Sequence, residues 1–352
     1  MATRNRKCNI VIDSCCDLPA DLVESFDVET VPFTFIMDDG EHLDDLWTSM
    51  TPHEFYERMR KGEHSSTSQV PYGTVQAALK RAATSGIPTV FICFSSCLSG
   101  TFECIVSTWD EMKGDYPDAE LHIVDSKLAS AAEGLLVMEA VRQCDRGLTA
   151  TELAAWVEEA RYYVHGYFTL AGLETLRRGG RIPDMAAVAG AKLDIRPILC
   201  FDLDGNLAFF GAARGRKKSI KQLLQIFHER FQISSSRMVL VAAADTDKEQ
   251  TALAEQLLKL PDKLSVWQTS IGPVIGSHVG PDMIAVVFWG SDRRENMSLT
   301  DRIAKAISER KRLADERSAD ERSANERSAD ECSANERLAH ERLANERLVD
   351  AL

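Results

Sequence analysis

Hydroxyl side chains gather where the sequence predicts a strand followed by a helix. Residues 95–101 read Ser-Ser-Cys-Leu-Ser-Gly-Thr, after the apolar run 89–94 and before a helix expected from Thr101. In a parallel α/β sheet this turn lies at the carboxyl ends of the strands, where such sheets bind ligands. Unpaired N–H groups at the helix start, together with Gly100, would let the backbone approach a carboxylate or a phosphate. Because Ser99 or Thr101 would also serve as an ordinary helix cap, the segment alone leaves both roles open.

A second group of hydroxyls precedes another expected helix. Residues 65–71 read Ser-Ser-Thr-Ser-Gln-Val-Pro and lead into a helix at 72–84. One such group is usually a helix cap. Two of them near the sheet edges of one domain indicate a shared site for an anion or a polar headgroup.

His278 lies in a third segment, residues 275–281, which is rich in glycine and small residues. A lone histidine is more often structural, but in a glycine-rich loop it could face a cleft and donate to an anion. Two basic stretches, 176–182 and 213–218, are either solvated helix ends or docking surfaces for an acidic or phosphate-bearing partner. The second stretch lacks the G-x4-G-K-[ST] spacing of a phosphate loop.

Several well-known catalytic and metal-binding patterns are absent from the sequence. It contains no G-x-S-x-G, no H-E-x-x-H and no G-x-G-x-x-G after a strand. Asp13, Asp17, Asp44 and Asp45 have no accompanying base or ligand spacing, so we expect loop or capping roles for them. The nine cysteines are odd in number and form no C-x-x-C, and Cys93 lies in an apolar run. We therefore expect free thiols in a reducing compartment, with metal binding as the weaker alternative.

Alternating strands and helices must position these residues. We expect strands at 7–12, 89–94, 121–124, 166–170, 196–201, 207–211, 238–243, 264–268 and 283–288, and helices at 19–25, 72–84, 101–113, 127–144, 149–163, 217–231 and 248–260. This alternation is typical of parallel sheets with helices on their faces. We expect two α/β domains, residues 1–163 and 164–292, each a mainly parallel or mixed sheet flanked by helices. The cleft between them is the expected ligand site.

The C-terminal segment differs in composition. Residues 316–350 consist of seven five-residue units of the type Glu-Arg-Ser-Ala-Asp. Five residues advance an α-helix by about 140°, so the units form no continuous apolar stripe. We expect residues 293–352 to be a charged extension, helical or disordered, rather than a coiled coil.

Charge and hydropathy narrow the classes of function. The chain has 41 Lys and Arg against 54 Asp and Glu, a net charge of −13, which argues against a nucleic-acid-binding protein. No apolar run approaches the ~20 residues of a membrane span. The apolar run 10–12 is too short for a signal peptide. We therefore expect a cytoplasmic protein with no membrane span and no nucleic-acid partner.

The order of these segments resembles the DegV family of bacterial fatty-acid-binding proteins, over about residues 8–290. The motifs that carry the resemblance are, in chain order, Ile12-Asp13-Ser14, Asp17-Leu18-Pro19, Thr67-Ser68-Gln69, Ser95-Ser96-x-Leu98-Ser99-Gly100-Thr101, Val124-Asp125-Ser126, Leu173-Glu174-x-Leu176, Gly179-Gly180-Arg181-Ile182, Pro197-Ile198-Leu199, Asp204-Gly205, Arg214-x-Arg216-Lys217-Lys218 and Ile275-Gly276-x-His278-x-Gly280-Pro281. This chain has Asp282 where the family often has a glycine.

The resemblance implies a DegV-like fold in which two α/β domains hold one long-chain fatty acid between them, with no metal or further cofactor. It places the fatty-acid carboxylate on Thr67 and Ser99, with Ser96 close by and His278 from the other domain. It puts Arg181 and Arg214 beside the head group or on a docking surface for a separate, dihydroxyacetone-kinase-like subunit. That subunit would use ATP and Mg²⁺ to form an acyl phosphate, so this chain would be a carrier and not an enzyme.

Two other functions stay open at this level. One is a stand-alone phosphotransferase or hydrolase with Ser96 or Ser99 as the nucleophile, although the sequence shows no local base beside either serine. The other is a lipid-sensing regulatory or scaffold protein whose C-terminal tail recruits a partner.

Overall fold

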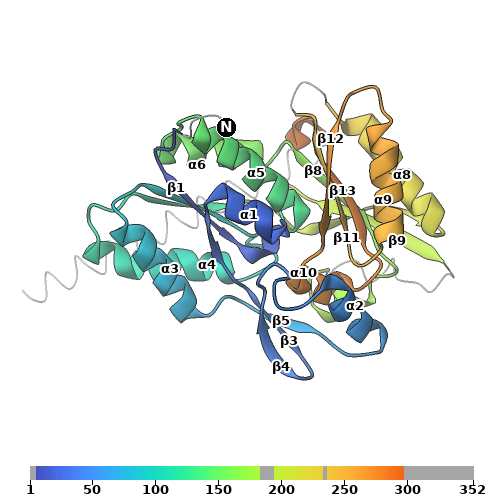
Figure 1. The fold of residues 1–352 in the computed structure, drawn as a ribbon, viewed down its shortest axis with the longest axis horizontal. Coiled ribbons are helices and arrows are strands. Elements are labelled where there is room, and N and C mark those ends of the chain that lie inside the picture. Colours follow the sequence, from blue (N-terminus) through green and yellow to red (C-terminus); the bar gives the residue numbers. More distant parts are fainter. Residues whose placement is uncertain (1–4, 183–193, 233–235, 297–352) are drawn as a thin grey trace, which may run out of the picture. The chain divides into compact units, whose positions relative to one another are not determined.

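We describe the protein from a computed structural model, which defines residues 5–182, 194–232 and 236–296. The described residues up to Arg294 belong to one compact unit. This unit contains two large β-sheets, one from each half of the sequence, and a smaller third sheet (Figure 1). Of the expected tail at 293–352, only the short 3-10 helix η4 (Arg293–Asn296) lies within the described residues.

The first large sheet has four parallel strands in the order β2-β1-β6-β7. Its strands are β1 (Asn9–Asp13), β2 (Glu29–Val31), β6 (Thr89–Cys93) and β7 (Leu121–Asp125). The helices around it are α1 (Ala20–Phe26), α3 (Tyr72–Thr84), α4 (Thr101–Met112), α5 (Ala131–Asp145) and α6 (Ala150–Ala160). Helices α3 and α4 pack together on one face, and α5 and α6 on the other (Figure 1). All five residues of β6 are buried, as a parallel strand covered on both faces requires.

Two helix starts show how local sequence sets the boundaries. Helix α6 begins with a capping box, in which the Thr149 hydroxyl accepts from the Glu152 N–H and the Glu152 carboxylate accepts from the Thr149 N–H. Helix α5 was expected from residue 127 but begins at Ala131. The reason is that Lys127 and Ser130 have φ values of +54° and +56°, which a right-handed helix cannot contain.

The small sheet and the helix beside it were not expected from the sequence. It is antiparallel, in the order β4-β3-β5, with β3 (Thr34–Met37), β4 (Gly40–Leu43) and β5 (Ser66–Ser68), and helix α2 (Pro52–Arg60) follows β4. Thr67 therefore lies in a strand, opposite Phe35, and not at a helix start. This strand pairing fixes the position of the Thr67 side chain.

The second large sheet is mixed, with strand order β10-β9-β8-β13-β11-β12. Its strands are β8 (Val164–Thr169), β9 (Ile195–Phe201), β10 (Leu207–Arg214), β11 (Met238–Ala243), β12 (Ser265–Ser270) and β13 (Ile284–Trp289). Helices α8 (Arg216–Arg230) and α9 (Asp247–Leu258) pack on one face. The short helices α7 (Glu174–Arg178) and α10 (Pro273–Val279) lie at the end of the sheet near the small sheet. Two further 3-10 turns are η1 (Ser14–Cys16) and η2 (Lys113–Asp115).

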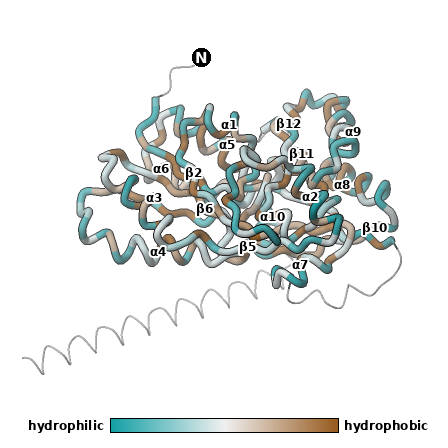
Figure 2. The backbone as a smooth tube through the Cα atoms, turned by 60° about the horizontal axis from the view of Figure 1, so that its bottom comes forward, coloured by the Kyte–Doolittle hydropathy of each residue, from teal (hydrophilic) through white to brown (hydrophobic). Residues whose placement is uncertain are grey.

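Helix α5 joins the two halves of the core. It packs on α6 and also on β8, β11 and β13 of the second sheet. Eleven of its 15 residues are buried, as expected for a helix enclosed on all sides. Figure 2 colours the backbone of these elements by the hydropathy of each residue. One hydrophobic cluster spans α5 and both large sheets, and a second lies between the mixed sheet and the helices α8 and α9.

The α/β architecture agrees with the sequence prediction, including the parallel first sheet and the mixed second sheet. The expected boundary after residue 163 falls between α6 and β8. A division into separate domains at that point stays a prediction. Within the described part of the chain, no helix combines the length and the hydropathy that crossing a bilayer requires.

Candidate functional site

A cavity of about 240 Å³ lies between the first turn of α5 and the side of β8 and β13 that faces it. Both halves of the sequence contribute to its wall. Most of the lining is apolar and includes Phe33, Phe94, Leu98, Phe168, Phe201 and Val287. The polar lining residues are Thr67, Ser68, Gln69, Ser99, Ser130, Arg181 and His278. We call the group formed by Thr67, Ser68, Gln69, Ser99, Arg181 and His278 the polar end, because contacts join it across the two halves of the sequence: Thr67 with His278, and Arg181 with the Leu98 carbonyl next to Ser99.

Thr67 and His278 are in direct contact at the polar end. The Thr67 Oγ1 atom lies 2.8 Å from His278 Nε2. The sequence placed His278 in a glycine-rich loop, but it occupies the last turn of helix α10. This helix begins with Pro273 at its first position and ends at Gly280, whose φ is +73°. Proline and glycine therefore mark the two ends of a short helix here, and not a loop.

His278 is partly buried, and its imidazole is neutral at pH 7. Burial lowers its pKa to about 4, and the nearby Arg181 guanidinium acts in the same direction. Its second ring nitrogen, Nδ1, has no hydrogen-bond partner among the described residues. That nitrogen lies against Gly179, where an added Cβ would approach it to 2.3 Å. The glycine is therefore a steric requirement of the His278 position.

Arg181 brings a positive charge to the same end of the cavity. Its Nε donates to the Leu98 carbonyl at 3.2 Å and its Nη1 donates to the Gly179 carbonyl. The side chain is half-buried, and this desolvation lowers its pKa. A guanidinium nevertheless keeps its proton in proteins, so the charge persists at neutral pH.

Ser99 has both of the roles that the sequence left open. Its Oγ accepts from the Thr101 N–H at 3.2 Å at the start of α4, and it also lines the cavity. Ser99 Oγ lies 3.0 Å from Thr101 Oγ1, which in turn accepts from the Val70 N–H at 3.2 Å. The two hydroxyl-rich segments are therefore linked to each other at the polar end.

Two of the expected site residues lie elsewhere. Ser96 does not line the cavity; its Oγ donates to Asp125 Oδ2 at 2.7 Å, and its N–H to Asp125 Oδ1 at 3.2 Å. Arg214 is exposed at the end of β10 and is also absent from the cavity wall. The structure thus brings together Thr67, Ser99, Arg181 and His278, but neither Ser96 nor Arg214.

The sequence did not point to Ser130, which also lines the cavity. Its hydroxyl donates to the Asp17 carboxyl group, and burial raises the pKa of that group well above its ordinary value. The one local signal is that this serine directly precedes the alanine-rich start of α5, the position of a helix cap, although its hydroxyl bonds to Asp17 and not to the helix. Its partner Asp17 is far away in sequence, and no local pattern connects the two.

A family model described as an uncharacterised protein of the DegV family matches residues 7–290, most of the chain. The chain belongs to the DegV family. A DegV domain-containing protein of Clostridium perfringens is 35% identical over 288 residues, covering 82% of this chain and 99% of the relative. A DegV domain-containing protein of Streptococcus pyogenes is 31% identical over 286 residues, 81% of this chain and 99% of the relative.

Solved DegV structures share the fold. One from Thermus thermophilus, described by its fatty acid binding, has a TM-score of 0.71 at 26% identity and covers 81% of this chain and 100% of its own. Another from Eubacterium ventriosum, described as a stearic-acid-binding protein, has a TM-score of 0.69 at 26% identity and covers 82% and 100%. Both of these solved proteins, the first of them a DegV family member, are thus described as binding a fatty acid.

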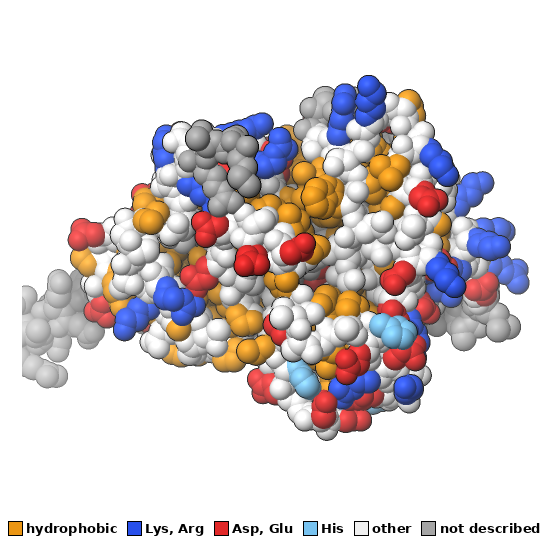
Figure 3. All heavy atoms as spheres, viewed as in Figure 1, with side chains coloured by type: hydrophobic (Ala, Val, Ile, Leu, Met, Phe, Trp, Pro, Cys, Tyr) orange, Lys and Arg blue, Asp and Glu red, His pale blue; other side chains and the backbone are white. Residues whose placement is uncertain are grey.

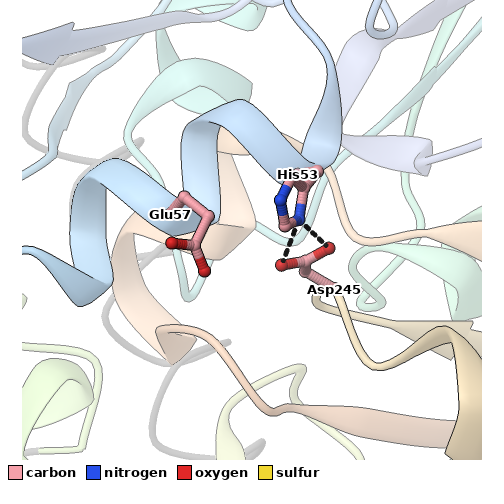
Figure 4. A group of neighbouring side chains, drawn as sticks. All are labelled: His53, Glu57 and Asp245. Atoms are coloured by element: carbon pink, nitrogen blue, oxygen red, sulfur yellow. Dashed lines mark hydrogen bonds and ion pairs between the residues drawn. The ribbon is translucent and has the colours of Figure 1, made fainter.

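Within the part of the chain that the structure describes, this DegV protein has one group of three potential metal ligands, which lies outside the cavity. His53 Nδ1 lies 3.1 Å from both carboxylate oxygens of Asp245, and Glu57 lies one turn along α2 from His53 (Figure 4). The ligand atoms of the three residues lie within 4.8 Å of one another. However, the Arg60 guanidinium already donates to Glu57 at 3.0 Å and to Asp245. The group is therefore a charged link between α2 and the turn after β11.

Proposed function

We propose that the protein binds one long-chain fatty acid in this cavity, with the carboxylate at the polar end and the acyl chain along the apolar wall. The observation that carries the proposal is the composition of the cavity wall, since hydroxyl, imidazole and guanidinium groups gather around the contact between Thr67 and His278, and apolar side chains make up most of the remaining wall. The fatty-acid-binding DegV proteins of Thermus thermophilus and Eubacterium ventriosum support the same class of ligand.

The contact between Thr67 and His278 prepares a hydrogen-bond donor for the carboxylate. His278 Nδ1 faces Gly179 without an acceptor, so the single proton of the neutral ring belongs on Nε2. Nε2 then donates to Thr67 Oγ1, and the threonine keeps its own hydrogen for the ligand. We assign this tautomer from the hydrogen-bond network. His278 thus acts through Thr67 and needs no charge of its own.

Ser99 and Arg181 complete the polar end. Thr101 Oγ1 accepts from the Val70 N–H and can donate its own hydrogen to Ser99 Oγ, and in that arrangement the Ser99 hydrogen is left to donate to the carboxylate. Arg181 adds a full positive charge near the carboxylate, and hydrogen bonds that involve charged groups are about twice as strong as neutral ones. Along the rest of the cavity, each buried methylene of the chain contributes about 0.8 kcal/mol.

The direct test is binding of palmitate and oleate to the delipidated full-length protein. A hydrogen bond to a charged group contributes about 1.5–3 kcal/mol, so Thr67→Ala and Ser99→Ala should each weaken binding by about 10- to 150-fold. Ser96→Ala is the matched control, because Ser96 bonds to Asp125 outside the cavity. Absence of saturable binding in the unaltered protein contradicts the proposal, and equal binding by all three variants contradicts the assignment of the polar end.

We further propose that the protein is a carrier that presents the bound acid to a separate kinase subunit of the dihydroxyacetone-kinase type, in the cytoplasm. Ser68, Gln69 and Gly100 beside the polar end are exposed, so the carboxylate would lie near the surface. Among the described residues, neither Ser96 nor Ser99 is hydrogen-bonded to a histidine base. The eight described cysteines are free thiols, which fits a reducing compartment.

Arg214 belongs to an exposed basic surface together with Lys217, Lys218 and Lys221 at the start of α8. Figure 3 shows Lys and Arg side chains gathered on the side of the molecule formed by α8 and α9. This surface suits an acidic partner. Arg214→Ala should keep fatty-acid affinity unchanged while lowering acyl-phosphate formation with the kinase subunit. Unchanged acyl-phosphate formation would remove Arg214 from the docking surface.

A further inference from the structure

We propose that Gly166 and Phe201 together form the floor of the cavity and set the longest acyl chain that it accepts. The inference rests on the function proposed above and adds the property of the ligand that these two residues select.

The strand register gives the direction of the cavity. Strand β8 runs from Val164 to Thr169 and then leads to α7 and the polar end. Strand β13 runs antiparallel to it, with Ala285 opposite Phe168 and Val287 opposite Gly166. Side chains two residues apart in a strand lie on the same face, about 7 Å apart. The pair Phe168 and Ala285 is therefore nearer the polar end, and the pair Gly166 and Val287 lies one step deeper.

Phe201 lies at this deeper level of the cavity. Tyr167 pairs with Cys200 in the neighbouring strand, so Phe201 lies beside Gly166. An added Cβ on Gly166 would lie 3.0 Å from Phe201 Cε2 and 3.3 Å from the Cβ of Ala132 on α5. The phenyl ring therefore occupies the space that a side chain at position 166 would need. All three residues line the cavity.

Hydrogen bonds hold the backbone of Phe201 and of the hairpin turn that follows it. The Phe201 carbonyl accepts from Arg293 Nη1 at 3.0 Å, and the same guanidinium donates to the Arg161 carbonyl at 3.1 Å. The hairpin turn after Phe201 is tied to the first half of the chain, because the Ser95 hydroxyl donates to the Gly205 carbonyl at 3.0 Å. The backbone that holds the ring is thus anchored at two points, and a longer ligand cannot displace it without breaking these hydrogen bonds.

This floor predicts a break in the dependence of affinity on chain length. Each methylene that enters the cavity should tighten binding about fourfold, until the terminal methyl group reaches Phe201. Further methylenes then find no apolar space and should add nothing or weaken binding.

The experiment measures the affinity of the delipidated full-length protein for saturated fatty acids from decanoate to eicosanoate, by competition with a fluorescent fatty-acid probe. Gly166→Ala adds a methyl group to the floor and should move the break to shorter chains, with a loss of about fourfold for each excluded methylene. Phe201→Ala removes the ring and should move the break to longer chains. Gly172→Ala is the matched control, because an added Cβ there meets nothing within 4 Å and Gly172 lies outside the cavity wall.

We expect the break in the dependence of affinity on chain length to shift in opposite directions in the two variants. A general loss of stability would not produce opposite shifts. If Gly166→Ala does not fold, the shift to longer chains in Phe201→Ala decides the question alone. A break at the same chain length in the unaltered protein and in Phe201→Ala overturns the inference. Absence of fatty-acid binding in the unaltered protein overturns the proposed function instead, which keeps the two failures distinct.

Discussion

Because His278 is partly buried and has a lowered pKa, its contribution to the free energy of unfolding depends on pH. The variant His278→Gln measures this contribution. His278→Gln keeps an N–H near the position of Nε2 that can donate to Thr67, but it removes the titrating ring. The folded state holds the pKa of His278 at about 4, against an ordinary value of 6.5. The unfolded chain therefore takes up a proton before the folded one does as the pH falls.

The difference between these two pKa values determines how the contribution of His278 to the free energy of unfolding changes with pH. The contribution of His278 is fully present above about pH 6.5 and declines as the pH falls toward about 4, because protonation favours the unfolded state. Relative to pH 7, the loss works out at about 2 kcal/mol at pH 5 and about 3 kcal/mol at pH 4. Asp13 and Asp44, whose pKa values burial raises to about 7, oppose this trend, since they protonate more readily in the folded state. They are present in both proteins and cancel in the comparison.

The assay is urea denaturation of the delipidated protein and of His278→Gln over a series of pH values from 7 to 4. The free energy of unfolding of the variant, minus that of the unaltered protein, should rise by about 2 kcal/mol between pH 7 and pH 5. A difference that stays constant over this range would show that His278 takes up a proton as easily in the folded state as in the unfolded one. It would then refute the description of the ring as partly buried and neutral.

Two further predictions concern the surroundings of the cavity. Gly179→Ala should weaken fatty-acid binding about tenfold or more, because its Cβ would displace His278 and break the bond to Thr67; Gly73→Ala, where an added Cβ meets nothing within 4 Å, is the control and should leave binding unchanged. Ser130→Ala removes the hydrogen bond to the buried Asp17 carboxyl group and should lower the free energy of unfolding by about 1–3 kcal/mol in urea denaturation, whereas an unchanged value would contradict this bond.

The sequence predicted the large elements of the fold well, because their signals are local. The apolar run of β6 and the capping box of α6 each specify structure within a few residues. The strand-to-helix turn at Ser99 also lies at a place where parallel sheets bind ligands, so its position on the cavity wall followed from topology.

The remaining parts depend on contacts that no local pattern reveals. Strand β5 has only three residues, Ser-Thr-Ser, and its pairing with β3 decides its conformation. Helix α10 contains glycines and a proline that resemble a loop, yet it is buried between α2, α7 and the small sheet. Ser96 was expected at the ligand because of its hydroxyl group, but Asp125, at the end of the neighbouring strand β7, takes that hydroxyl.

The position of helix α5 connects the free energy of ligand binding with the free energy of folding. Its first turn forms one wall of the cavity, and the same helix fills the space between the two large sheets. A ligand that contacts this turn therefore also affects the packing of α5 against both sheets. In the same way, a mutation in the buried part of α5 should change the affinity for the ligand. Occupancy of the cavity and packing of the two halves are in this way thermodynamically linked, so the ligand-free and the ligand-bound protein should differ in stability throughout the compact unit and not only at the site.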